Sequence, residues 1–145
     1  MKKKILIADD DASVRKALGR VLEEEGYQII LAADGREAVE KFESGPVDLL
    51  VLDIALPIKT GWNTFERITS RVPALPIVII TGKANPCDLA VAAGLGAVME
   101  KPLEVSQLLQ TMQELLGKSP EDRLRRLYGH EHDAHCLRSQ SADHP

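Results

Sequence analysis

The sequence predicts an α/β fold, in which a doubly wound, five-stranded parallel sheet carries helices on both faces. Short apolar runs of strand length alternate with segments of helical periodicity up to about residue 117. The clearest runs are apolar at every position, as in strands that are buried on both faces of a parallel sheet. Short connections join these segments, as in neighbouring elements of one domain. We therefore expect one domain over residues 1–117.

The first half of this domain contains two strands and two helices. An apolar run at 5–8 stops at acidic residues, and apolar side chains then recur at helical spacing over 14–22. Gly26 follows the last turn of this helix as a C-terminal stop. The run at 29–32 predicts the second strand. Apolar positions within 38–42 predict the second helix, which a Ser-Gly-Pro sequence ends.

The second half repeats the alternation. Strands are expected at 49–52, 76–80 and 97–99, and helices after Gly61, at 85–94 and at 105–116. Asn85 and Pro86 suit the N-cap and first position of a helix, and Gly94 suits its end. The run at 97–99 is the weakest strand signal.

The composition narrows the class of protein and of partner. Of the 145 residues, 44% are hydrophobic and 28% are charged, with a net charge of −4. The absence of a basic block and the low aromatic content of 3% argue against a nucleic-acid partner. No apolar run is long enough to cross a membrane, and two cysteines are too few for a disulfide framework. We expect a cytoplasmic protein with no membrane partner.

The residues at the ends of the apolar runs are the candidate functional groups. In chain order they are Asp9, Asp10, Asp11, Asp53, Thr81 and Lys101. In a doubly wound sheet the ligand site lies outside the carboxyl ends of the strands, so these residues should converge. Clustered carboxylates repel one another, and Mg²⁺ relieves that repulsion. A lysine and a hydroxyl suit phosphoryl oxygens, and Asp53 is then the nucleophile that forms an acyl phosphate.

Four motifs occur in order along the domain. They are Ile5-Leu6-Ile7-Ala8-Asp9-Asp10-Asp11, Leu50-Val51-Leu52-Asp53 followed by Pro57 and Gly61, Ile79-Ile80-Thr81-Gly82, and Lys101-Pro102. Together they resemble the receiver domain of bacterial two-component response regulators, over about residues 3–117. This resemblance implies a flavodoxin-like sheet with the strand order 2-1-3-4-5. It also implies a stand-alone receiver that acts as a signalling switch, and not an enzyme that turns over an external substrate.

The resemblance assigns the phosphoacceptor and the metal ligands. Asp53 matches the aspartate that takes a phosphoryl group from phosphohistidine. Asp9 and Asp10 match the acid pair that holds Mg²⁺, and Asp53 and the backbone carbonyl of Ala55 complete the protein ligands. Asp11 is expected to be the N-cap of the first helix.

The resemblance also assigns the groups around the phosphoryl oxygens. Thr81 matches the hydroxyl that moves onto the phosphoryl group, and Lys101 matches the cation that pairs with it. Gly82 matches a position where a small residue keeps the site accessible, and Pro102 matches a proline after a cis bond. The implied phosphodonor is a sensor histidine kinase or a histidine phosphotransfer protein, and the implied receiver of the signal is an output protein of unknown identity.

Three positions depart from the family pattern. Val98 stands where receivers usually carry the Tyr or Phe of a rotameric switch, which puts the usual coupling to that ring in doubt. Lys59 and Thr60 replace a frequent Met-Asp pair. Ala55 lacks the polar side chain that often follows the phosphoacceptor.

Two other functions compete with the phosphorylated switch. In a phosphatase of the haloacid dehalogenase type, Asp9 and Asp11 would be the first motif, with Thr81 and Lys101 following, but Asp53 would have no role. A receiver that binds proteins without phosphorylation would not need the acidic and basic residues of the site. Flavodoxin-like flavin binding lacks a Ser/Thr-rich phosphate loop after the first strand.

Residues 118–145 are expected to be a short polar tail, mostly disordered, with one helix over 122–128. His130, His132, His135 and Cys136 could bind a transition metal, but their spacing matches no standard site. The tail is too short for a DNA-binding output domain. The sequence is either a stand-alone receiver or a piece of a longer protein.

Overall fold

The computed structural model describes residues 2–53, 61–82 and 96–118, and the side chains of residues 61 and 62 are not described. Its strands are β1 (Lys4–Ala8), β2 (Gln28–Ala32), β3 (Leu49–Asp53), β4 (Ile77–Thr81) and β5 (Gly96–Glu100). Its helices are α1 (Ala12–Glu24), α2 (Gly35–Glu43), α3 (Gly61–Arg71) and α5 (Val105–Leu116). The helix expected at 85–94 and the one expected at 122–128 lie outside the described residues.

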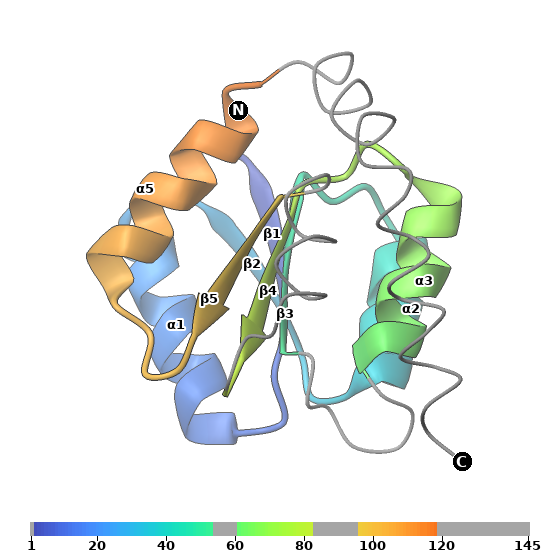
Figure 1. The fold of residues 1–145 in the computed structure, drawn as a ribbon, viewed down its shortest axis with the longest axis horizontal. Coiled ribbons are helices and arrows are strands. Elements are labelled where there is room, and N and C mark those ends of the chain that lie inside the picture. The colour runs from blue at the N-terminus through green and yellow to red at the C-terminus, as the bar shows by residue number, and fades with distance from the viewer. Residues whose placement is uncertain (1, 54–60, 83–95, 119–145) are drawn as a thin grey trace.

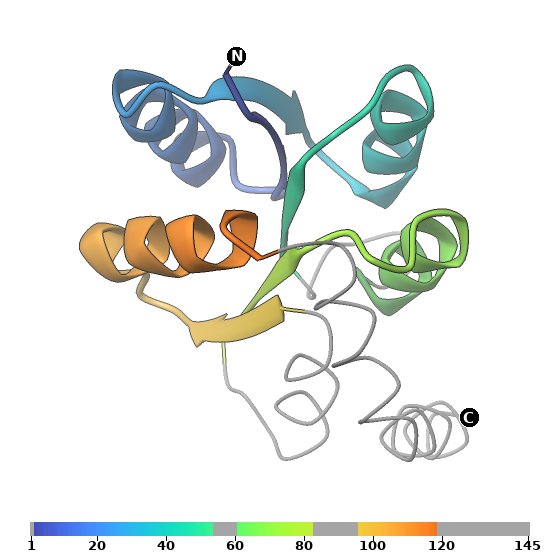
Figure 2. The same cartoon turned by 90° about the horizontal axis from the view of Figure 1, so that it is seen from above.

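The five strands form one parallel sheet with the order β2-β1-β3-β4-β5. This confirms the predicted fold class and strand order. Helices α1 and α5 cover one face of the sheet, and α2 and α3 cover the other (Figures 1 and 2). Because all strands run in the same direction, their carboxyl ends meet at one edge of the sheet, which is the lower edge in Figure 1.

The strands alternate their side chains between two hydrophobic cores. Leu50 and Leu52 of β3 pack into the core beneath α2 and α3. Leu49 and Val51 of the same strand pack into the core beneath α1 and α5. All of β3 is buried, which explains why its sequence is apolar at every position before Asp53.

Local signals set the ends of the helices. The side chain of Asp11 accepts hydrogen bonds from the backbone N–H groups of Ser13 and Val14, so the expected N-cap is present. Gly26, just after α1, has a φ angle of 95°, a left-handed conformation that glycine adopts readily. Helix α2 begins earlier than its apolar positions suggest, because the side chain of Asp34 caps it by accepting from the N–H of Glu37. None of the described helices is long and apolar enough to cross a lipid bilayer.

Candidate functional site

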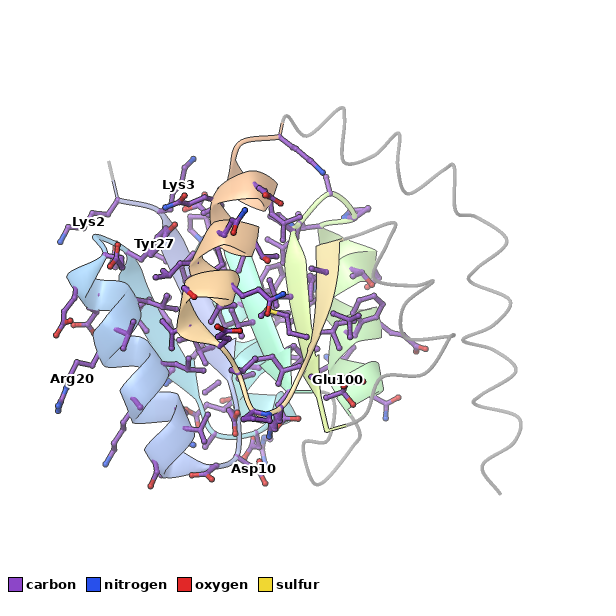
Figure 3. The ribbon with its side chains drawn as sticks, turned by 60° about the vertical axis from the view of Figure 1, so that its left-hand side comes forward. Lys2, Lys3, Asp10, Arg20, Tyr27 and Glu100 are labelled. Carbon is purple, nitrogen blue, oxygen red and sulfur yellow. The ribbon has the colours of Figure 1, made fainter. Side chains whose placement is uncertain are left out.

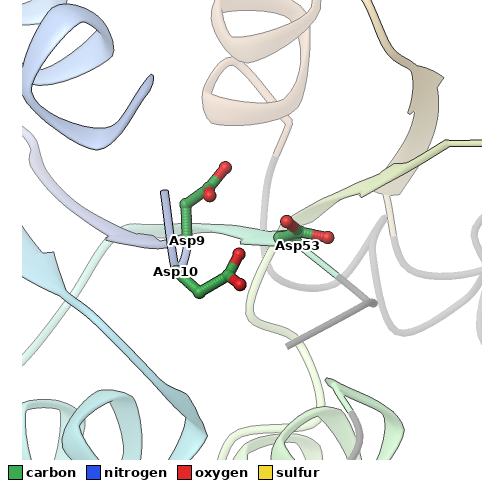
Figure 4. A group of neighbouring side chains, drawn as sticks. All are labelled: Asp9, Asp10 and Asp53. Carbon is green, nitrogen blue, oxygen red and sulfur yellow. The ribbon is translucent and has the colours of Figure 1, made fainter. Parts of the chain in front are cut away.

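The candidate residues converge at the edge of the sheet where the strands end. Asp9 and Asp10 directly follow β1, and Asp53 is the last residue of the neighbouring strand β3. Figure 3 shows Asp10 and Glu100 at this end of the sheet, and Lys3 at the opposite end. In Figure 4 the carboxylates of Asp9, Asp10 and Asp53 gather around one point.

The three carboxylates form a tight, partly buried cluster. One oxygen of each of Asp9, Asp10 and Asp53 lies within 4.8 Å of the others. Asp9 and Asp53 are each only 1% exposed, whereas Asp10 is exposed. The Oδ2 atom of Asp9 is buried and has no hydrogen-bond partner among the residues that the structure describes. A buried, unpaired carboxylate oxygen is costly, so the cluster favours a cation.

The turn between β1 and α1 holds Asp9 by its other polar atoms. Its Oδ1 accepts a hydrogen bond of 2.9 Å from the N–H of Asp11. Its own N–H donates to the carbonyl of Ala32 in β2, at 3.1 Å. Its carbonyl oxygen accepts from Nη1 of Arg15 at 2.8 Å. Arg15 was not among the residues expected in the site. Its one signal in the sequence is that a basic residue lies one turn into the helix that follows an acidic cluster.

Lys101 provides the positive charge of the site. Its Nζ donates to Oδ2 of Asp53 at 2.9 Å, and the Lys101–Pro102 peptide bond is cis, as the resemblance implied. The backbone N–H of Lys101 donates to the carbonyl oxygen of Thr81 at 2.9 Å. Thr81 is the last residue of β4 and is buried. Asp53, Thr81 and Lys101 therefore lie at the ends of three adjacent strands, in the order β3, β4 and β5.

Burial and charge shift two ionisation equilibria in the site. Burial raises the pKa of Asp9; the backbone hydrogen bond from Asp11 opposes the rise, and the charge of Asp53 adds to it. The hydrogen bond to Asp53 raises the pKa of Lys101, which keeps the ammonium charged. Among the described residues, the carboxylates of Asp9, Asp10 and Asp53 gather around a single ammonium group, that of Lys101, so this part of the site carries an excess of negative charge.

These residues fit a magnesium ion. Mg²⁺ takes oxygen ligands, typically one or two carboxylates together with water and phosphate oxygens. Asp9, Asp10 and Asp53 offer three converging carboxylate oxygens, and Oδ2 of Asp9 has no competing partner. The fourth expected ligand, the carbonyl of Ala55, lies outside the described residues, as do Lys59 and Thr60.

The structure also places three other positions that the sequence singled out: Gly82, Val98 and Asp11. Gly82 is exposed, and a Cβ added there would meet no atom of the described residues within 4 Å. Val98 is half-buried and packs against the core beneath α2 and α3. Asp11 caps α1 with its carboxylate and is not a member of the metal cluster, which removes half of the first motif that the phosphatase hypothesis needs. The histidines and Cys136 of the tail lie outside the described residues.

Known proteins share this fold and its sequence pattern. The chain is similar to the response regulator MprA of Mycolicibacterium vanbaalenii, with 34% identity over 121 residues, which are 82% of this chain and 52% of that protein. It is 35% identical to the alkaline phosphatase synthesis transcriptional regulatory protein PhoP of Bacillus subtilis, over 82% of this chain and 50% of that protein. The chain thus spans about half the length of these curated relatives.

Solved structures give the same result. A CheY-like receiver domain protein from Methanospirillum hungatei matches with a TM-score of 0.75 and 29% identity, covering 86% of this chain and 98% of that one. The response regulator TrrA from Thermotoga maritima, solved in complex with Mg²⁺-BeF, matches with a TM-score of 0.70 and 32% identity, covering 78% of this chain and 98% of that one. The family model of the response regulator receiver domain matches residues 5–113. The chain therefore belongs to the receiver-domain family of two-component response regulators.

Proposed function

We propose that this receiver takes a phosphoryl group from phosphohistidine onto the carboxylate of Asp53. The observation that carries the proposal is the position of Asp53. It is a buried carboxylate at the end of the central strand, 2.9 Å from the ammonium of Lys101 and within 4.8 Å of the acid pair Asp9 and Asp10. A nucleophile, a cation and a set of metal ligands thus converge on one carboxylate.

The transfer is a substitution at phosphorus. An oxygen of Asp53 attacks the phosphorus atom, the new O–P bond forms, and the P–N bond to the donor histidine breaks. The electron pair of that bond leaves with the imidazole nitrogen, and the product is an acyl phosphate on Asp53. Lys101 remains charged and pairs with a phosphoryl oxygen, and the hydroxyl of Thr81, the last residue of β4, donates to another.

The proposed magnesium ligands are Asp9, Asp10 and Asp53, together with the carbonyl of Ala55. Their support is the unpaired Oδ2 of Asp9 and the excess of negative charge in the cluster. When bound, Mg²⁺ neutralises phosphoryl oxygens as the negative charges of donor and acceptor approach each other. TrrA, a relative at 32% identity, was solved in complex with Mg²⁺-BeF, which supports magnesium binding by this chain.

The proposed partners are a sensor histidine kinase or a histidine phosphotransfer protein as donor, and an output protein that binds a surface altered by phosphorylation. The expectation that nucleic acid is not a partner has no support from the relatives, because one of them is named a transcriptional regulatory protein. The domain boundary at residue 117 and a cytoplasmic location stay predictions.

Incubation with acetyl phosphate and Mg²⁺, followed by intact-mass measurement, tests the proposal. We expect a gain of one phosphoryl group in the natural sequence, and none in the Asp53→Asn variant or in the presence of EDTA. An Asp11→Asn variant is the matched control, because it removes a nearby acid that serves as a helix cap. Equal phosphorylation of the Asp53→Asn protein would rule out Asp53 as the acceptor.

A further inference from the structure

Asp9 is held in place by several hydrogen bonds at once. Asp9 has four polar groups, of which three are paired: its N–H with Ala32, its Oδ1 with the N–H of Asp11, and its carbonyl oxygen with Arg15. Only Oδ2, which belongs to the carboxylate cluster, has no partner. The three bonds therefore fix the residue and leave one oxygen for a cation.

The bond from Arg15 acts on Asp10 as well as on Asp9. The carbonyl that it binds belongs to the peptide unit joining these two residues, and a peptide unit is planar. Holding the carbonyl oxygen therefore fixes the plane from which Asp10 projects. Among the described residues, the exposed carboxylate of Asp10 has no hydrogen-bond partner that would orient it directly.

Helix stability does not explain why this residue is basic. Arg15 lies in the first turn or so of α1, which begins at Ala12, and a positive charge near a helix N-terminus opposes the helix dipole. Arg15 is half-buried, its guanidinium donates to a main-chain oxygen, and it makes no ion pair within the described part of the chain. It thus leaves the carboxylate oxygens of the cluster available to a cation.

We propose that Arg15 is a positioning residue of the magnesium site, which orients Asp9 and Asp10 through the carbonyl that lies between them. This inference rests on the proposed function, because it requires Asp9 and Asp10 to bind Mg²⁺. Groups that hydrogen-bond to metal ligands, without touching the metal themselves, typically contribute about 10-fold or more to metal affinity.

The test compares Mg²⁺ affinity, measured by calorimetry, with the free energy of unfolding, measured in EDTA. Arg15→Met and Arg15→Gln both remove the guanidinium. If one of these variants does not fold, the Mg²⁺ affinity of the other still tests the inference. Arg15→Lys keeps a positive donor. Arg20→Met is the matched control, since Arg20 lies on the same helix and points outward in Figure 3.

We expect Arg15→Met and Arg15→Gln to bind Mg²⁺ about 10-fold more weakly than the natural sequence. Arg15→Lys should lose less affinity for Mg²⁺ than the other two variants, and Arg20→Met should bind Mg²⁺ as tightly as the natural sequence does. Unchanged Mg²⁺ affinity in Arg15→Met or Arg15→Gln overturns the inference, even if unfolding becomes easier, because Arg15 would then serve only the fold. Unchanged affinity in Asp10→Ala would instead refute the proposed ligand set, and with it the inference.

Discussion

Replacing Asp9 with asparagine should stabilise the protein when no divalent cation is present. Asp9 and Asp53 are each 1% exposed, with one oxygen of each lying within 4.8 Å of the other. Two unit charges 4.8 Å apart repel by about 3.5 kcal/mol at an effective dielectric constant of about 20. Lys101 offsets part of this repulsion through its bond to Asp53. We therefore expect Asp9→Asn to raise the free energy of unfolding by about 1–2 kcal/mol.

Asparagine preserves the local structure while it removes the charge. Its amide oxygen can still accept from the N–H of Asp11, and its NH₂ group supplies a donor where Oδ2 of Asp9 has no partner. Asp11→Asn is the matched control, because it makes the same change in charge and asparagine caps a helix about as well as aspartate.

Urea denaturation in EDTA, repeated with excess Mg²⁺, measures the effect. Bound Mg²⁺ adds about 2.7 kcal/mol at a concentration of 100 times Kd. The natural sequence should gain this stability, and the Asp9→Asn variant should gain much less. With Mg²⁺, the difference in free energy of unfolding between the two proteins should therefore shrink or change sign. A lower free energy of unfolding for Asp9→Asn than for the natural sequence in EDTA would refute the electrostatic reasoning.

The stability difference between the natural sequence and Asp9→Asn should depend on pH. Burial raises the folded-state pKa of Asp9 above its unfolded value of 3.8. The loss of stability that ionised Asp9 causes is therefore fully present above its raised, folded-state pKa. This loss disappears as the pH falls toward the pKa of Asp9 in the unfolded chain. In EDTA, the difference in stability between the natural sequence and Asp9→Asn should shrink on acidification, and a constant difference would contradict this origin.

Two further substitutions test other parts of the account. Lys101→Met should lower the free energy of unfolding in EDTA by about 1 kcal/mol. This value is reduced for solvent screening, because the Lys101 side chain is 39% exposed. An unchanged free energy of unfolding would show that the bond to Asp53 contributes nothing to folding. Gly96→Ala should disrupt the pairing of β4 with β5, because the added Cβ would clash with the carbonyl oxygen of Ile77. A melting temperature equal to that of the natural sequence would argue against this close approach.

The fold followed from the sequence because its local signals agree. Apolar runs, helical periodicity and the Gly26 stop point to the same alternation of strands and helices, and each described element occurs where it was expected. The observed ends of β3 and β4 differ from the expected ones, because a polar residue belongs to each strand. Asp53 and Thr81 are the last residues of β3 and β4 and do not lie beyond them, because the ladder continues through their backbone.

The sequence led us to expect that Asp9, Asp10, Asp53 and Lys101 would converge, but it did not predict the contacts between them. Asp53 and Lys101 are 48 residues apart, so their contact follows only from the strand order, which the family resemblance supplied. The bond of Arg15 to the carbonyl of Asp9 depends on the path of the turn between β1 and α1. A side chain that binds the main chain leaves no periodic pattern, and so no sequence rule could identify it.

Locating the acyl phosphate in the sequence shows whether Asp53 is the phosphoacceptor. The protein is phosphorylated with acetyl phosphate and Mg²⁺ and then reduced with borohydride, which converts a phosphorylated aspartate to homoserine. Peptide mass spectrometry then identifies the altered residue. We predict homoserine at position 53 and unmodified Asp9, Asp10 and Asp11, because Asp53 is the carboxylate that holds Lys101. Homoserine at any of the other three positions, with Asp53 unchanged, would contradict the account.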